Sequence, residues 1–149
     1  MGGSLTPISA IQALTSANKI AVYSIYGDFK RANRDMNFYT PSAIMTVNFG
    51  SSNFTSNWSH IDGGPMSSAT ISGTVTGNSF QSNSLSYSNY YMPPTAVTGE
   101  MKGNFNGTQA QALSGSLTVN VSGQTTEGVF IGQQVNNTVN EIPNGNLDL

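Results

Sequence analysis

The sequence contains no cysteine and little charge. Its 149 residues include five Lys or Arg, seven Asp or Glu and a single His, for a net charge of −2. Without cysteine the chain can form neither a disulfide nor a thiolate metal site. So few basic residues also exclude the positively charged surface that nucleic-acid binding requires. No apolar run approaches the roughly 18 residues of a membrane-spanning helix, so we do not expect the chain to span a membrane.

Neutral polar residues take the place of the missing charge. Ser, Thr, Asn and Gln together number 59, and there are 16 glycines. Soluble globular domains average about a quarter charged residues. The composition therefore favours a secreted protein or one on the bacterial outer surface, and an extracellular or outer-surface location is our expectation.

The length predicts a single domain. We expect residues 1–4, MGGS, to be an expression-tag remnant or a linker, and residues 5–134 to form the domain. Residues 135–149 contain NN and PNG and few apolar side chains, so we expect a loosely ordered tail. The sequence leaves open whether the chain is full-length or an excised domain, and what its oligomeric state is.

One helix is predicted, over residues 5–18. Thr6 is a suitable N-cap, and Pro7 suits the first helical position. From Ile8 onward, apolar residues recur at helical spacing. The rest of the chain has a different pattern, with no second helix.

Short runs rich in Val, Ile, Thr, Tyr and Phe follow the helix and alternate with turns of Gly, Asn and Ser. Apolar and polar residues alternate within these runs, which indicates strands with one buried and one solvated face. Because no helix separates the strands, we expect an antiparallel meander that closes into a barrel and so removes its edges. The predicted fold is all-β: an eight-stranded antiparallel up-and-down β-barrel with one short N-terminal helix. Its predicted strands are 19–27, 42–49, 53–60, 67–75, 79–87, 96–105, 113–121 and 125–133.

Several glycines lie at apolar positions of these strands. A glycine inside a strand usually marks a sharp bend or a close approach of backbones, and a small barrel needs both. A phosphate-binding loop is therefore not expected in the glycine-rich segment 98–123. With eight strands, the interior has room only for side chains or one small ligand, and the sequence leaves that choice open. The glycines concerned are Gly73, Gly99, Gly103, Gly115 and Gly132.

The sequence carries no catalytic signature. His60 is the only histidine, and no Gly-x-Ser-x-Gly elbow accompanies it. No nucleotide-binding or metal-binding motif appears. The seven acidic residues are scattered, which leaves a two-carboxylate hydrolase site as the one enzymatic alternative. We therefore expect a protein that is not an enzyme and that needs no cofactor or metal.

The segment GEMKGNFNGTQAQALSGSLTVNVSGQTTEGVFIGQQ, residues 99–134, resembles the last three strands of the β-barrel domains of transferrin-binding protein B. Those barrels show a Gly-x-Phe-x-Gly-Pro-x-Ala-x-Glu-x-Gly-Gly pattern followed by a Gly-Val-Phe-Gly strand. Here Thr108 replaces the usual Pro, and Gln111 replaces the usual acidic residue. Related barrels form the C-terminal part of secreted bacterial haemophores and end larger surface proteins. The resemblance implies the barrel fold and a lipoprotein-like surface module more than a particular ligand. The matching residues are Gly103, Phe105, Gly107, Ala110, Ser114, Gly115, Gly128, Val129, Phe130 and Gly132.

The connections of an up-and-down barrel emerge alternately at its two ends. The end that carries the helix has tight turns, whereas the other end has three long links, at 28–41, 61–66 and 88–95. Loops on a rigid scaffold commonly carry binding, and Tyr and Arg are enriched at binding hot spots. We therefore predict a binding site on the rim opposite the helix. Its candidate residues are Lys30, Arg31, Arg34, Phe38, Tyr39, His60, Tyr90 and Tyr91.

Each candidate also has a purely structural interpretation. The aromatic residues can pack over the barrel mouth, the positive charges can balance acidic neighbours in a solvated loop, and His60 can simply end a strand. These interpretations stay open at the level of the sequence.

Three functions are compatible with the sequence. The first is a non-enzymatic bacterial surface or secreted binding module whose rim contacts a host or surface protein, a glycan or a small ligand. The second is haem capture, which the resemblance to haemophores implies, with His60 as an axial ligand, Tyr90 or Tyr91 as the other, and Arg31 or Arg34 pairing with the propionates. The third is a structural or assembly module at the end of a larger exported protein.

Overall fold

The computed structural model describes residues 4–31, 39–61, 67–89 and 96–135. The predicted helix and all eight predicted strands are present, and the strand bounds differ from the prediction by at most four residues. The elements are α1 (Ile8–Ser16), β1 (Ile20–Arg31), β2 (Ser42–Asn48), β3 (Asn53–Ser59), β4 (Ser67–Thr76), β5 (Ser79–Asn89), β6 (Val97–Asn106), β7 (Ala112–Val121) and β8 (Gln124–Val135).

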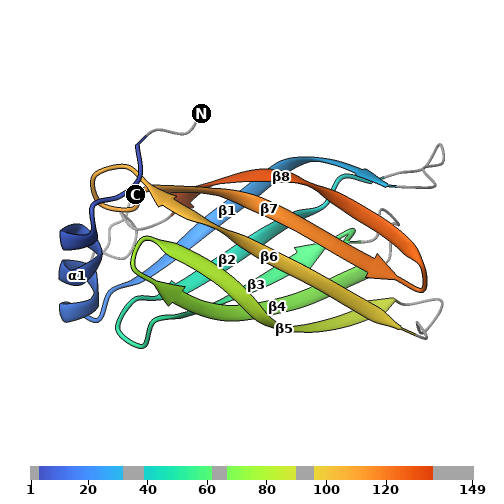
Figure 1. Ribbon diagram of the computed structural model, residues 1–149, viewed down its shortest axis with the longest axis horizontal. Coiled ribbons are helices and arrows are strands. Elements are labelled where there is room, and N and C mark those ends of the chain that lie inside the picture. Colours follow the sequence, from blue (N-terminus) through green and yellow to red (C-terminus); the bar gives the residue numbers. More distant parts are fainter. Residues whose placement is uncertain (1–3, 32–38, 62–66, 90–95, 136–149) are drawn as a thin grey trace, which may run out of the picture.

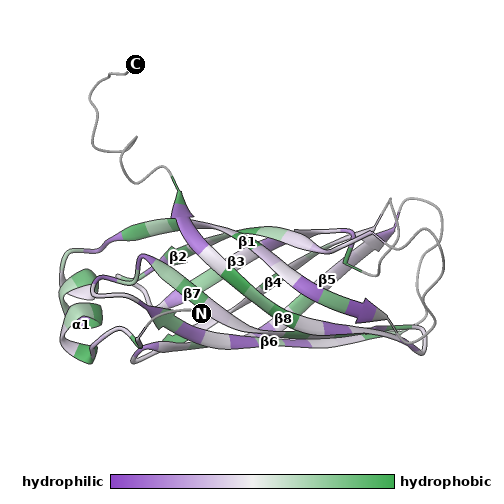
Figure 2. Ribbon diagram, turned by 90° about the horizontal axis from the view of Figure 1, so that it is seen from above, coloured by the Kyte–Doolittle hydropathy of each residue, from purple (hydrophilic) through white to green (hydrophobic). Residues whose placement is uncertain are grey.

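The strands form one closed barrel in sequence order, and every pair of neighbours is antiparallel. β8 closes the barrel by pairing with β1, so that Gly132 lies opposite Ile25 and Gly128 lies opposite Phe29. Figure 1 shows α1 across one end of the barrel, and Figure 2 shows hydrophobic and hydrophilic residues alternating along the strands. The predicted eight-stranded up-and-down barrel with one N-terminal helix is confirmed.

The start of the helix differs from the prediction. Pro7 is the N-cap residue, with an extended backbone (ψ 146°), and is not the first helical residue; its carbonyl accepts the N–H of Ala10 at 3.0 Å. Thr6 is therefore not the cap. Its N–H instead donates to the Phe105 carbonyl on β6 at 2.9 Å, and its buried hydroxyl has no hydrogen-bond partner. The hydrogen bond to β6 thus sets the backbone conformation before the helix. Ile11 is buried on the helix face that covers the barrel.

Aromatic side chains fill the barrel interior along its length. From the helix end, Tyr23 contacts Phe105 (ring centroids 6.1 Å apart), Phe105 contacts Phe80 (5.4 Å) and Phe80 contacts Phe130 (6.5 Å). Phe130 in turn contacts Trp58 at 5.8 Å. None of these five side chains is more than 2% exposed, and burying each one stabilises the fold by roughly 1.5–3 kcal/mol. Among the described residues, the interior is occupied by side chains.

A serine inside the barrel is satisfied by its neighbours. The Ser56 hydroxyl donates to the Ile71 carbonyl at 2.8 Å and accepts the indole N–H of Trp58 at 3.0 Å. Buried polar groups are costly unless they are hydrogen-bonded. These bonds therefore fix the Trp58 ring in one orientation instead of destabilising the core.

Two glycines let the barrel wall lie close to the core. Gly103 on β6 and Gly115 on β7 are direct partners in the sheet. A Cβ on Gly103 would lie 2.7 Å from Cζ of Phe80, and one on Gly115 would lie 2.7 Å from Cζ of Phe130. The two rings thus occupy the space that inward side chains would need, which confirms the close approach predicted for both glycines.

Candidate functional site

All eight strands reach the rim opposite α1, and four of them carry the described candidate residues or flank them. The last residues of β1 and β3 reach this end, and β2 and β4 begin there (Figure 1). Tyr39 lies a few residues before β2, and His60 directly follows β3. The antiparallel order of the barrel thus brings together two aromatic residues that are far apart in the sequence.

Tyr39 and His60 pack face to face on this rim. Their ring centroids are 5.0 Å apart and their planes differ by 25°. His60 has a left-handed backbone (φ 59°), and its N–H donates to the Ser67 carbonyl at 2.8 Å. The left-handed turn interrupts the regular alternation of β3 and directs the imidazole to Tyr39. Tyr39 itself is 44% exposed, so the pair presents an aromatic surface to solvent.

A packed floor lies beneath this pair. Ile61, next to His60, is completely buried. Phe29 and Trp58 meet edge to face, with ring centroids 6.0 Å apart and planes at 89°. Because the described interior is filled up to this level, a partner would contact the rim from outside.

The predicted site residues fall into two groups. Tyr39 and His60 are in contact, and Lys30 is exposed on β1 opposite Glu127 of β8. Arg31 is the last residue of β1, so its backbone also lies at the end of the barrel opposite α1, as predicted. The other four candidates lie outside the described residues and stay predictions: Arg34, Phe38, Tyr90 and Tyr91.

The opposite end of the barrel is sealed. The Tyr23 hydroxyl donates to the Ala110 carbonyl at 2.6 Å, and both residues are fully buried. Ala110 has a left-handed backbone (φ 59°), which turns its carbonyl toward the barrel mouth. Burial raises the pKa of the Tyr23 phenol far above its ordinary value, and a hydrogen bond with the Gln134 side chain offsets this shift in part. Tyr23 is thus a neutral hydrogen-bond donor that holds the 107–111 turn over the interior.

Metal-binding chemistry has little support in the described part of the chain. No three His, Asp or Glu side chains within it are placed to hold a metal ion. Haem ligation needs fewer protein groups, and His60 beside Tyr39 supplies two side-chain types that ligate haem iron. Separately, no helix of the described segments is long and apolar enough to cross a bilayer.

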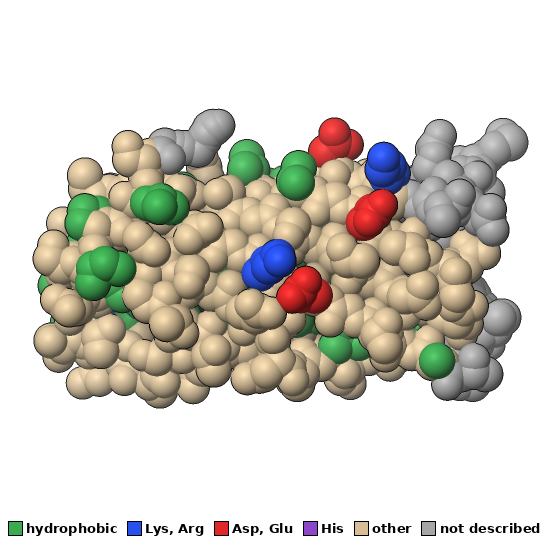
Figure 3. Space-filling model, viewed as in Figure 1, with side chains coloured by type: hydrophobic (Ala, Val, Ile, Leu, Met, Phe, Trp, Pro, Cys, Tyr) green, Lys and Arg blue, Asp and Glu red, His purple; other side chains and the backbone are tan. Residues whose placement is uncertain are grey.

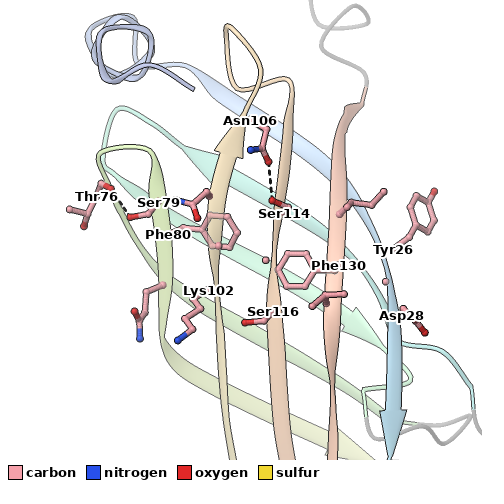
Figure 4. A pocket seen from close by; sticks show the side chains of 17 residues that line it. Tyr26, Asp28, Thr76, Ser79, Phe80, Lys102, Asn106, Ser114, Ser116 and Phe130 are labelled. Atoms are coloured by element: carbon pink, nitrogen blue, oxygen red, sulfur yellow. Dashed lines mark hydrogen bonds between the residues drawn. The ribbon is translucent and has the colours of Figure 1, made fainter. Parts of the chain in front are cut away.

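The structure also shows a feature that was not predicted: a groove of about 1250 Å³ on the outer wall of the barrel (Figure 4). Gly103 and Gly115 lie in its floor, where the wall approaches the core. Val129 and Ile131 lie along one side and are 62% and 53% exposed. The signal in the sequence was the motif GVFIG, which places two large apolar residues at outward positions between glycines.

These features define the class of the protein: a single β-barrel with a packed interior, one sealed end and an aromatic pair on the other rim. Comparison with known proteins gives the family. The family model described as the C-lobe and N-lobe β-barrels of Tf-binding protein B matches residues 10–134. The chain belongs to this family, as the segment 99–134 predicted.

Solved structures with the same fold include much longer relatives. A double variant of transferrin-binding protein B from Haemophilus parasuis Hp5 is similar, with a TM-score of 0.61, 16% identity, and 87% of this chain and 28% of that chain covered. The isotype 1 transferrin-binding protein B of serogroup B Neisseria meningitidis gives a TM-score of 0.59 and 17% identity, with 87% and 27% covered. At these identities the likeness shows the fold, and this chain spans less than a third of either relative.

A protein described as a surface lipoprotein is also similar, with a TM-score of 0.51, 16% identity, and 78% of this chain and 62% of that chain covered. No curated protein sequence matches the chain. The expected extracellular or bacterial outer-surface location is confirmed at the level of the family.

Proposed function

We propose that this barrel is a non-enzymatic binding module of the bacterial surface, and that it contacts a protein partner through the rim opposite α1. The observation that carries the proposal is the exposed stacked pair of Tyr39 and His60. Tyrosine is enriched at binding hot spots because it combines a large rigid contact area with a hydroxyl group. Lys30 lies near the end of β1 at the same end of the barrel, opposite Glu127 of β8.

The rest of the described structure supports a surface site over an internal one. The interior is filled with aromatic side chains, and the Tyr23–Ala110 hydrogen bond seals the helix end. The solved relatives are named as transferrin-binding proteins, which makes host transferrin the first partner to examine. This chain is much shorter than those relatives, so another host protein is an equally suitable candidate.

The experiment compares three immobilised proteins: the wild type, a Tyr39→Ser/His60→Ser variant, and an Ile20→Ser control. Ile20 is 50% exposed, similar to Tyr39, but lies where β1 begins, at the helix end of the barrel. Each protein is exposed to purified transferrin and to host serum, and the recovered proteins are identified by mass spectrometry. We expect a partner to be retained by the wild type and the control and lost by the rim variant.

Equal recovery by the rim variant would contradict the proposed site. Failure of all three proteins to retain any partner would favour the third function, a structural or assembly module without a ligand.

Haem capture stays a second candidate because His60 and Tyr39 lie side by side. The imidazole is half-buried in the stack, so its ring edge would have to reach the iron. Titration of micromolar haem gives a direct test: a Soret shift that disappears in His60→Ala supports this candidate, and an unchanged haem spectrum removes it.

A further inference from the structure

The groove on the outer wall is the second surface of the barrel with the properties of a binding site. It extends over β7 and its neighbours, and a smaller cavity of about 460 Å³ continues it, sharing Asp28, Ser116 and Val129 with the larger one. Pockets for single small ligands measure about 300–1,000 Å³. The larger cavity alone exceeds this range, so it is large enough for a chain of several linked units.

One side of the groove is apolar. Tyr26 on β1 lies directly opposite Ile131 on β8, and Val129 is the next outward residue of β8. All three are more than half exposed. Figure 4 shows the Tyr26 ring at one edge of the groove, well apart from Lys102. An aromatic ring beside two branched aliphatic side chains offers a flat apolar contact surface.

The centre and the opposite side are polar but almost uncharged. Ser114 and Ser116 are the outward residues of β7 in the groove, and Asn104 lies on the neighbouring strand β6. Lys102 contributes the one positive charge of the larger cavity, and its ammonium group lies 3.8 Å from the Glu100 carboxylate. Among the lining residues the charges of Lys102 and Asp28 balance, since Glu100 lies outside the lining. Figure 3 shows the charged side chains of this face as neighbours of opposite sign.

An apolar side facing a neutral polar side restricts which ligands can fill the groove. Ser114 donates to Asn106 and Asn104 to the Asn78 carbonyl, but a hydroxyl and an amide each have further hydrogen-bonding capacity. An apolar peptide face would bury that remaining capacity and the Ser116 hydroxyl without compensation, which is costly. A strongly charged ligand would lose hydration without gaining a net opposite charge. A sugar ring has a face of C–H groups and a rim of hydroxyl groups that both donate and accept hydrogen bonds. It therefore matches an apolar wall that faces neutral hydroxyl and amide groups.

We propose that the outer groove along β7 binds an uncharged oligosaccharide, with its C–H faces on Tyr26, Val129 and Ile131 and its hydroxyl groups toward Ser114 and Ser116. The larger cavity shares no lining residue with the candidate rim site, so this proposal does not depend on the proposed protein partner. One barrel would then carry two binding surfaces: the rim for a protein partner and the groove for a glycan.

The experiment follows the methyl resonances of Val129 and Ile131 by NMR while neutral hexasaccharides are added. The probes are the hexamers of α-1,4-glucose, β-1,4-glucose, β-1,3-glucose, β-1,4-mannose and β-1,4-N-acetylglucosamine. We expect at least one probe to shift these resonances saturably, with a dissociation constant of about 1 mM or tighter. Tyr26→Ala should weaken that binding about fivefold, and Ser116→Lys, which fills the groove, should abolish it.

Matched controls lie on β2 and β3, which contribute no residue to the groove. Ile44→Ala removes an outward apolar residue of β2, and Thr55→Lys adds the same charge and bulk at an outward position of β3. Both should bind like the wild type. Thermal unfolding of each variant distinguishes a blocked groove from a misfolded barrel.

Several results would overturn the proposal. Failure of all five hexasaccharides to shift Val129 or Ile131 at about 10 mM would exclude this ligand class. Unchanged binding in Ser116→Lys would place the sugar elsewhere. Two other occupants have their own signatures: concentration-dependent shifts without sugar would assign the groove to a second copy of the chain, and saturable shifts caused only by an amphipathic Leu/Lys peptide would assign it to a helix.

Discussion

The two ends of the barrel differ in how they are closed. At the helix end, α1 covers the mouth, Thr6 is tied to β6, and the Tyr23 hydroxyl holds the Ala110 carbonyl. At the other end, Ile61 and Trp58 are buried under a rim that carries the partly exposed Tyr39. The first end uses hydrogen bonds and burial to hold the fold, whereas the second leaves an aromatic pair available to solvent.

This difference implies a division of labour along one short barrel. Substitutions at the sealed end should lower the free energy of unfolding and affect binding only through folding. Substitutions on the rim should affect binding with little effect on stability.

The largest effect is expected for Phe105→Ala at the sealed end. Phe105 is completely buried and contacts the rings of Tyr23, Phe49 and Phe80. Removing such a ring leaves a cavity and costs about 3–5 kcal/mol. Urea unfolding of the variant measures the loss. A loss no larger than that of Tyr39→Ala at the rim would contradict the division between the ends.

A smaller loss is expected in the wall that joins the ends. In Gly103→Ala the new Cβ would meet the Ser114 carbonyl oxygen and the Phe80 ring. Overpacking of this kind costs about 1–3 kcal/mol. Ser116→Ala, at an outward position of the paired strand, is the control and should change the unfolding midpoint very little. Equal midpoints for both variants would show that the wall can relax away from the core.

The architecture was predictable because it depends on local pattern. The alternation on β7, with Leu113, Leu117 and Val119 inward, follows from a period of two that only a strand satisfies. The helix start was wrong by one residue because Thr6 pairs with the Phe105 carbonyl. Capping rules consider only the residues around the helix start, so they could not predict this hydrogen bond to β6.

The site was predictable in place but not in detail. Strand order alone put Tyr39 and His60 at the same end. Their stacking depends on the left-handed backbone of His60, which is uncommon for a residue other than glycine. The groove depends on a distant contact in the same way: Gly103 meets Gly115 across two strands, and no local pattern in the sequence specifies that register.

A buried tyrosine makes the sealed end sensitive to alkali. The folded-state pKa of Tyr23 is raised above the ordinary value of 10.0, so its contribution to stability is complete below about pH 10. This contribution is lost as the pH rises from there toward the folded-state pKa, by up to about 1.4 kcal/mol per pH unit. Thermal melts from pH 8 to 11 should show this decline.

Tyr23→Phe separates this tyrosine from the others. At neutral pH it should cost about 1–2 kcal/mol, because the buried Ala110 carbonyl loses its donor. Above pH 10 the variant should lose stability less steeply than the wild type. Tyr26→Phe, which alters an exposed hydroxyl, should retain the wild-type profile. The same steep decline in Tyr23→Phe would assign the alkaline transition to another group.

The smallest change in stability is expected at the rim. Tyr39→Ser removes a ring that is 44% exposed and stacks on His60. Because most of the stack lies at the surface, the free energy of unfolding should fall by less than about 1 kcal/mol. Partner binding, measured on the same samples, should fall at least tenfold if the ring is a binding hot spot. A large loss of stability with binding retained would assign Tyr39 to the packing of this end and reverse the contrast between the two ends.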